Sequence, residues 1–278
     1  MAVVDEAPVG APVTTARPGR YGLRGVIESE WTKMRTVRST MWTLFATVVL
    51  SLGIGALACW AVSSHWDQMT LLDRLTFDPT SQSLTGLLFG QLALGILGVL
   101  VVSAEYSTGS IRATLAAVPR RPLVVVGKAL VYGAVALAVG EIVSFAAFEI
   151  GQAVLSGGPA PNSALSDPGV LRAVVGGGLY LTALGLLAVG LGWIIRHTAG
   201  GIATFVGILL ILPLILAALP TSFRDAIGKF LPANIGATMT AVRQPQHAFG
   251  PWQSFGLLCA YAAVALVVGA WLLVRRDA

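Results

Sequence analysis

Side chains that could catalyse a reaction or bind a metal are few and scattered. The chain has three histidines, His65, His197 and His247, and two cysteines, Cys59 and Cys259. They form neither a His-Glu-x-x-His nor a Cys-x-x-Cys motif, so no metal site is expected. Both cysteines lie in apolar runs, and we interpret them as small buried side chains, with a disulfide between the outer ends of two helices as the alternative. A Gly-x-Ser-x-Gly nucleophile motif is also absent. The sequence therefore does not predict an enzyme.

Nucleotide hydrolysis by this chain is excluded on similar grounds. The phosphate-binding motif Gly-x4-Gly-Lys-Ser/Thr is approached only at Gly127-Lys128, but Ala129 follows it and Pro122 stands where the first glycine is required. We therefore expect no bound cofactor, and neither ATP nor Mg²⁺, on this chain. If the protein uses the energy of ATP, a separate polypeptide must hydrolyse it.

One carboxylate lies inside an apolar run. Glu141 is about midway along the run 123–150, and Glu149 follows two helical turns later, near the outer end. A charge at the centre of a bilayer costs about 2.5–3.5 kcal/mol. Glu141 is therefore expected to be neutral and hydrogen-bonded, to be paired, or to line a polar pathway, with Gln91 and Gln152 as nearby polar groups. These alternatives remain open from the sequence alone.

The elements that must position these residues are membrane helices. Hydrophobic residues make up 55% of the 278 residues and charged residues 11%, with a mean hydropathy of +0.79. Soluble domains carry about 25% charged residues. The net charge of +5 therefore indicates membrane topology and contacts with lipid headgroups, and no nucleic acid partner is expected. We predict an all-α polytopic membrane protein with six spans, each near the ~20 residues that cross a bilayer. The spans are expected at about 41–62, 84–103, 123–150, 170–195, 200–219 and 252–274.

Proline positions suggest irregular structure around the fifth span. Pro213 should kink that span or mark a break in it. Beyond it, Ser222 and Asp225 have the spacing of a helix N-terminal cap. Pro232 is expected to end this short helix, and 233–242 could form a second one. The two short helices would cover the outer mouth of the protein, and a plain surface hairpin is the alternative.

The N-terminal region divides into a tail and a helix. Residues 1–20 are rich in Ala, Pro, Val and Thr and are expected to form a disordered cytoplasmic tail, whereas 21–278 should form a single six-helix domain. Apolar residues then recur every three or four positions, which is typical of an amphipathic helix in the lipid headgroup layer with Trp31 as an interfacial anchor. These apolar residues are Leu23, Val26, Ile27, Trp31 and Met34. Charged residues occupy the other faces, namely Arg24, Glu28, Glu30, Lys33, Arg35 and Arg38.

The distribution of basic residues predicts the orientation. With both termini in the cytoplasm, only five of the 18 Lys and Arg residues fall on the opposite side, namely Arg74, Arg172, Arg224, Lys229 and Arg243. The positive-inside rule favours this arrangement. We therefore expect a multi-pass protein of the plasma membrane with both termini cytoplasmic.

A short basic segment between the second and third spans is the main functional signal. It runs from Glu105 through Arg112 to Arg120-Arg121, and Lys128 lies just inside the next apolar run. Because a membrane helix holds such charges only at high cost, we expect this segment and Lys128 to lie in water at the membrane surface. A short helix there, capped by a glycine and stopped by Pro119, would be a rigid docking element for an energy-supplying subunit.

This layout resembles the ABC-2 type permeases, the membrane subunits of ATP-binding-cassette exporters, especially those of high-GC Gram-positive bacteria. The resemblance covers about residues 21–276, and the segments that carry it are 28–33, 105–128 and 230–236. It implies a permease that moves an unidentified substrate with ATP and Mg²⁺ bound by a separate ABC ATPase. Six spans are half a transporter, so a second, identical or sister, permease chain and a second ATPase would complete the complex.

The resemblance also implies roles for particular residues. The stretch 222–242 would form paired re-entrant helices, and the helix at about 22–38 would lie near the ATPase, with Glu30, Trp31, Lys33 and Arg35 on it. The implied ATPase-coupling residues are Glu105, Tyr106, Thr108, Gly109, Arg112, Pro119, Arg120 and Arg121. Two other hypotheses remain, a stand-alone membrane enzyme or ion pathway centred on Glu141, and a permease-like protein with a structural or immunity role.

Overall fold

The computed structural model describes residues 22–118, 120–244 and 248–275. All regular secondary structure in these ranges is helical. Within these ranges, six helical segments are long and apolar enough to cross a membrane, which confirms the predicted all-α architecture with six candidate membrane helices. The segments are Arg38–Ser64 (α2), Pro79–Ser107, Arg121–Ser156 (α7), Val170–Ile195 (α8), Thr198–Ala217 (α9, η3 and α10) and Pro251–Arg275 (α13). The second segment consists of α4 (Pro79–Ser83), η2 (Leu84–Gly86) and α5 (Leu87–Ser107). The tail expected at 1–20 lies outside the described residues.

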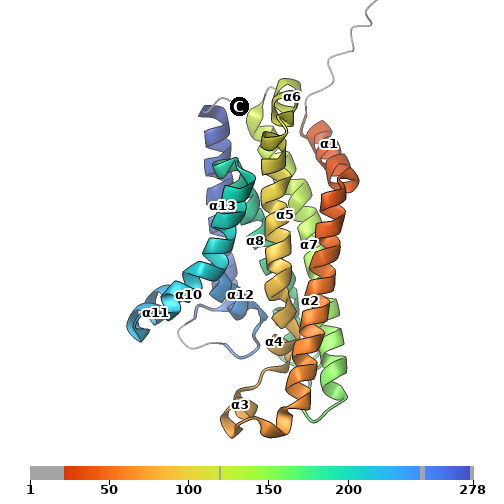
Figure 1. Cartoon of the computed structure of the whole chain (residues 1–278), viewed down its shortest axis with the longest axis vertical. Coiled ribbons are helices and arrows are strands. Elements are labelled where there is room, and N and C mark those ends of the chain that lie inside the picture. Colours follow the sequence, from red (N-terminus) through yellow and green to blue (C-terminus); the bar gives the residue numbers. More distant parts are fainter. Residues whose placement is uncertain (1–21, 119, 245–247, 276–278) are drawn as a thin grey trace, which may run out of the picture.

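Helix α8 is the centre of the bundle, and α5, α7 and α13 pack around it (Figure 1). In the most apolar part of α8, 67% of the residues are buried, whereas in that of α2 only 22% are buried. Glycines on α8 allow the close approach of its neighbours, as expected where lipid provides no hydrophobic drive for helix association. At Gly190, for example, a Cβ atom would lie only 2.5 Å from Cβ of Ala265 on α13.

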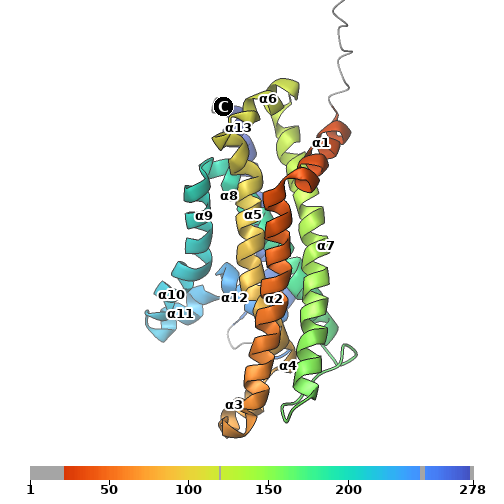
Figure 2. The same ribbon diagram turned by 45° about the vertical axis from the view of Figure 1, so that its right-hand side comes forward.

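Shorter helices lie at the two ends of the bundle. At one end are α1 (Leu23–Thr36) and α6 (Ser110–Ala117), and α3 (Leu71–Thr76) lies at the opposite end, after the short η1 (Trp66–Gln68) (Figure 2). The extended backbone of Val37 separates α1 from α2, so that α1 bends away from the axis of the first span. Its bounds agree with the helix predicted at about 22–38.

The fifth span is interrupted where Pro213 predicts a kink. Its first part, α9 (Thr198–Val206), continues into a π-helical turn, η3 (Gly207–Ile211), and then into α10 (Leu212–Ala217). Because proline lacks an N–H group and its ring clashes with the carbonyl four residues earlier, the wider π turn relieves the conflict. Helix α10 then leads away from the bundle towards α11 (Figure 1).

Two short helices precede the last span, but their ends differ from those predicted. Helix α11 (Thr221–Gly228) begins after Pro220 and has no capping side-chain hydrogen bond, so the predicted cap by Ser222 is wrong. Pro232 begins α12 (Pro232–Thr240) instead of ending α11. A proline in the first helical turn loses no intrahelical hydrogen bond, which explains its place there. Most residues of α11 are exposed, whereas five of the nine in α12 are buried.

The two cysteines are free thiols, Cys59 buried and Cys259 partly buried. The disulfide alternative is therefore wrong. Cys59 lies in a small apolar cluster with Leu155 and Ala160 at the α3 end, as expected for a small buried side chain.

Candidate functional site

A closed ring of four charged side chains joins α1, α5 and α7 at the α6 end of the bundle. Lys128 Nζ lies 2.6 Å from Glu30 Oε2 and 2.8 Å from Glu105 Oε1. Lys33 Nζ lies 2.7 Å from Glu30 Oε1 and 2.8 Å from the same Glu105 oxygen. We call Glu30, Lys33, Glu105 and Lys128 the charge ring. Its two ammonium groups and two carboxylates alternate, so the ring as a whole is neutral.

The buried face of α1 places Glu30 in the ring. Val26, Glu30 and Met34 are buried at four-residue steps, which puts them on one side of the helix. This side packs on α7 at Gly127, where a Cβ atom would lie 2.5 Å from Val26 Cγ1. The glycine therefore lets α1 approach α7 immediately beside Lys128.

The ring is mostly shielded from solvent. The side chain of Lys128 is 1% exposed and that of Glu30 3%, while Glu105 is 11% and Lys33 37% exposed. The prediction that Lys128 lies in water is therefore wrong. Its charge is tolerated because two carboxylates surround it, one of them 98 residues away in the sequence. The second carboxylate oxygen of Glu105, Oε2, is buried without a partner among the described residues, so the ring holds Glu105 through Oε1.

Lys33 closes the ring at its solvent-facing side. Burial lowers the pKa of Lys33, but its hydrogen bonds to Glu105 and Glu30 more than offset this effect, so its pKa lies above the ordinary lysine value. Lys33 is therefore firmly charged at neutral pH. A cavity of about 470 Å³ opens beside the ring, between the junction of α1 with α2 and the end of α5. Its apolar wall consists of Met34, Val37, Leu97, Leu100, Val101 and Ala104.

Two of the predicted coupling residues are structural ties between helices. The ring of Tyr106 packs edge-on against Trp193, with centroids 6.1 Å apart, and the guanidinium of Arg196 lies 5.2 Å from the Tyr106 centroid. Arg196 Nη2 and Arg121 Nη1 donate to the carbonyl oxygens of Leu272 and Leu273, respectively. Cationic side chains thus satisfy carbonyls in the last turns of α13. Tyr106 and Arg121 therefore hold α5 and α7 to α8 and α13.

The helix implied at 105–121 is shorter in the structure. Helix α5 continues to Ser107, so Glu105 and Tyr106 belong to its last turn, and α6 covers only Ser110–Ala117. Gly109 joins them with φ of 72°, which glycine adopts without strain. Thr108 Oγ1 donates to the carbonyl of Ala104 and closes the end of α5. A tight, defined corner therefore connects the charge ring to α6.

The remaining predicted residues point outward or lie elsewhere. Arg112 on α6 and Arg120 before α7 are exposed, as are Trp31 and Arg35 on α1. Ile111 anchors α6, since its side chain is 3% exposed. The structure thus leaves cationic groups free on the surface of this end. Pro119 lies outside the described residues.

Glu141 lies away from the charge ring and has different neighbours from those expected. It is half-buried on α7 against α8, where a Cβ atom on Gly178 would lie 2.5 Å from its carboxyl carbon. Gln91 accepts a hydrogen bond from Tyr180, and Gln152 donates to Ser83 and to the carbonyl of Pro79. The two glutamines are therefore engaged elsewhere, and the expected polar cluster around Glu141 is not formed.

Sequence reasoning recognised three of the four ring members as functional and placed the fourth, Lys128, in water. The expectation that Glu30 lies on a different face from the apolar residues of α1 is wrong, because Glu30 is four residues from both Val26 and Met34 and shares their buried face. This spacing was the available signal for the ring. A carboxylate on a buried face requires a cationic partner.

Within the described parts of the chain, no group of three or more His, Cys, Asp or Glu side chains is placed to bind a metal ion. No family model matches the chain, and no curated protein matches it. The function must therefore be argued from the six-helix architecture and the geometry of the charge ring.

Proposed function

We propose that the protein is the membrane-spanning permease subunit of an ABC exporter in the plasma membrane, with both termini in the cytoplasm. In this proposal, a separate ABC ATPase binds ATP and Mg²⁺ and docks on the α6 end of the bundle. A second permease chain, identical or sister, and a second ATPase complete the transporter. The observation that supports the proposal best is the charge ring directly behind α6.

The charge ring makes the α6 end suitable for transmitting force. Three helices, α1, α5 and α7, are tied by three short ion pairs that are mostly buried, and a fourth pair within α1 completes the ring. Helix α6 follows Glu105 after one tight corner at Gly109. A displacement of α6 would therefore move α5 together with α1 and α7. Closure of the ATPase pair on ATP would bias the bundle between two conformations, in the manner of a two-state equilibrium shifted by a ligand.

The surface of this end suits a soluble, acidic docking partner. Arg112, Arg120 and Arg35 are exposed, and none of them is used in the ion pairs of the ring. Exposed rim charges of this kind steer association and contribute to affinity when they meet complementary charges. The alternative of an ion pathway centred on Glu141 has less support, because Gln91 and Gln152 are hydrogen-bonded elsewhere.

Purification of the full-length chain from its native membranes tests the proposal. An ABC ATPase should co-purify, and Arg112→Ala with Arg120→Ala should reduce its amount about tenfold, which corresponds to about 1.4 kcal/mol of lost binding. Arg224→Ala is a matched control, because Arg224 is an exposed arginine on α11. The proposal is refuted if no ABC ATPase co-purifies, or if the double variant and the control retain the same amount.

Labelling of a single cysteine tests the orientation. Ser110→Cys is introduced at the start of α6 after both native free thiols, Cys59 and Cys259, are replaced by serine. A membrane-impermeant maleimide should label this cysteine in inside-out vesicles and leave it unlabelled in intact cells. Labelling in intact cells alone would place α6 on the wrong side for an ATPase.

A further inference from the structure

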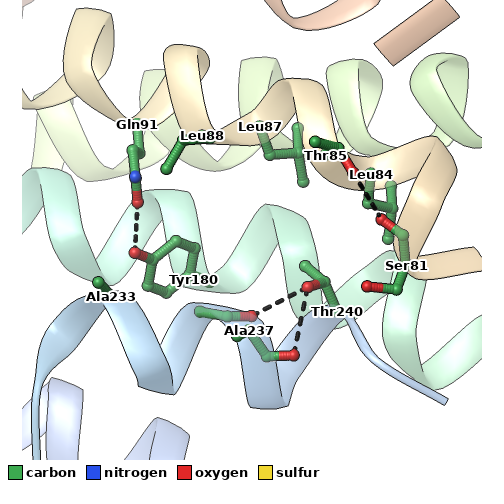
Figure 3. A pocket seen from close by; sticks show the side chains of 11 residues that line it. Ser81, Leu84, Thr85, Leu87, Leu88, Gln91, Tyr180, Ala233, Ala237 and Thr240 are labelled. Carbon is green, nitrogen blue, oxygen red and sulfur yellow. Dashed lines mark hydrogen bonds between the residues drawn. The ribbon is translucent and has the colours of Figure 1, made fainter. Parts of the chain in front are cut away.

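A second cavity, of about 200 Å³, lies near the opposite end of α5 from the charge ring (Figure 3). Its walls are formed by η2 (Leu84–Gly86) and the start of α5, by α8 and by α12, and it is open on one side, where Thr85, Leu88 and Ala237 are exposed. The residues that line it are Ser81, Leu84, Thr85, Leu87, Leu88, Gln91, Tyr180, Ala233, Gly236, Ala237 and Thr240. None of these side chains carries a charge.

One end of the cavity holds a buried, incompletely used amide. The hydroxyl of Tyr180 donates to Oε1 of Gln91, and the two residues are 4% and 2% exposed. The amide nitrogen of Gln91 makes no hydrogen bond with the described residues. This nitrogen is not one of the fully buried side-chain atoms that lack a partner, which indicates that it borders the cavity, where an acceptor from water or a ligand can reach it. Among the described residues, the Gln91 amide and the hydroxyl of Ser81, which makes no hydrogen bond there either, are the donors available to a bound molecule.

The hydroxyls of two other lining residues are already engaged as donors. The hydroxyl of Thr85 donates to the carbonyl of Ser81, and that of Thr240 donates to the carbonyls of Gly236 and Ala237. Between these groups and Gln91, the walls are apolar (Figure 3). The cavity therefore matches a short apolar group that ends in an uncharged oxygen acceptor. Its volume is below the roughly 300–1,000 Å³ of sites for drug-sized molecules, so it holds a small molecule or one end of a larger one.

Gly236 sets the depth of the cavity under α12. A Cβ atom on Gly236 would lie 2.5 Å from Cζ of Tyr180, so a larger residue would push α12 away from the tyrosine ring. Gln91 and Glu105 also lie on the same helix, roughly 21 Å apart along its axis at 1.5 Å per residue. A ligand that shifts α5 at Gln91 therefore acts on the helix that carries one carboxylate of the charge ring.

We propose that this cavity binds the neutral, oxygen-bearing end of the molecule that the protein exports, with the amide nitrogen of Gln91 donating to that oxygen. Ligand binding follows from the cavity itself, whereas the identity of the ligand as the exported molecule rests on the proposed function.

Protection of a cysteine in the cavity tests the proposal. The full-length chain with Ala237→Cys, Cys59→Ser and Cys259→Ser is placed in lipid nanodiscs, and its labelling by N-ethylmaleimide is timed. Ala237 is an exposed lining residue and suits this reagent. The probes are N,N-dimethyloctanamide, which has a neutral oxygen acceptor, and octylammonium, which has the same chain length and no acceptor. The amide should slow labelling at least fivefold, and octylammonium should leave the rate unchanged.

Variants identify the contact. Gln91→Leu should raise the half-protecting concentration of the amide probe about tenfold, the effect of losing one buried hydrogen bond. Gln68→Leu, on the exposed η1 segment, is the matched control and should have no effect. Gly236→Ala keeps Gln91 but places a Cβ atom against the ring of Tyr180, whose hydroxyl holds the Gln91 amide, so it should also weaken protection. This second variant keeps the test decisive if Gln91→Leu fails to fold.

Three results would overturn the proposal. They are equal protection by both probes, unchanged protection in Gln91→Leu and Gly236→Ala, and labelling that is slow in ester-linked lipids but fast in ether-linked lipids without any probe. The last result would assign the cavity to the ester carbonyl of a bilayer lipid. Protection without a co-purifying ABC ATPase would retain the binding site and refute export, whereas a co-purifying ATPase without protection would refute the cavity alone.

Discussion

Replacement of Lys128 by methionine is the most direct test of the charge ring. Methionine keeps most of the length of the side chain but removes its charge. The substitution leaves Glu30 and Glu105 in a nearly dry environment with Lys33 as their remaining partner in the ring. Removal of one partner from a buried ion pair destabilises a protein by about 3–5 kcal/mol, because the remaining charge is left uncompensated. We expect a loss of stability of this size for Lys128→Met.

The ring provides its own control in Lys33→Met. Lys33 contacts the same two carboxylates at nearly the same distances, but its side chain is 37% exposed instead of 1%. Water can therefore solvate the carboxylates after it is removed, and the loss should be about 0.5–1 kcal/mol, as for exposed ion pairs. The comparison isolates the effect of burial from that of the contacts themselves.

Stability can be measured by reversible unfolding in mixed detergent micelles, followed by circular dichroism. A double-mutant cycle with Glu30→Gln should show strong coupling to Lys128→Met, because the two groups are 2.6 Å apart. Equal losses for the two lysine variants, or additive effects of Lys128→Met and Glu30→Gln, would refute the reasoning that the buried half of the ring dominates its stability.

Three further predictions concern the same end of the molecule. Gly127→Ala should lower the free energy of unfolding by about 1–3 kcal/mol, because its Cβ atom would meet Val26. The control is Gly53→Ala on α2, where a Cβ atom would meet nothing within 4 Å, and it should be neutral or slightly stabilising in the same unfolding assay. Gly109→Ala should lower the free energy of unfolding by about 1 kcal/mol, because φ is 72° at this position. The substitution should also displace α6 and so reduce co-purification of the ATPase. Unchanged co-purification would count against the role of this corner. The pKa of Lys33 in the folded protein is raised above 10.5, so its contribution to stability is complete below pH 10.5 and is lost as the pH rises through the folded-state pKa. Thermal melts of wild type and Lys33→Met should therefore converge only above pH 10.5. Convergence near pH 8 would contradict this assignment.

The six spans could be predicted from the sequence because each is a long apolar run, and the bounds expected for 170–195 agree with those of α8. The predicted ends of α11 and α12 were wrong, because a proline can either follow one helix or start the next. Only tertiary packing decides between these two possibilities. The helix predicted at 105–121 was too long, because Gly109 separates the end of α5 from α6.

The charge ring depends on contacts that are distant in the sequence. Lys128 was placed in water because an unpaired ammonium group is costly in a membrane helix. The partners of Lys128 belong to α1 and α5, and the residue pattern of α7 alone does not identify them. The position of Glu30 on the buried side of α1 was the available clue, since the cost of burying it could be met only by a cation from another helix.

The π-helical turn at Gly207–Ile211 also changes the rotational phase of the fifth span. One additional residue in a helix turns everything after it by about 100°. In α10, Leu214 and Ile215 face outward and are 68% and 56% exposed. Deletion of a single residue from the turn would rotate this apolar face around the helix axis and change the direction in which α11 leaves the bundle, while α9 would keep its packing on α5.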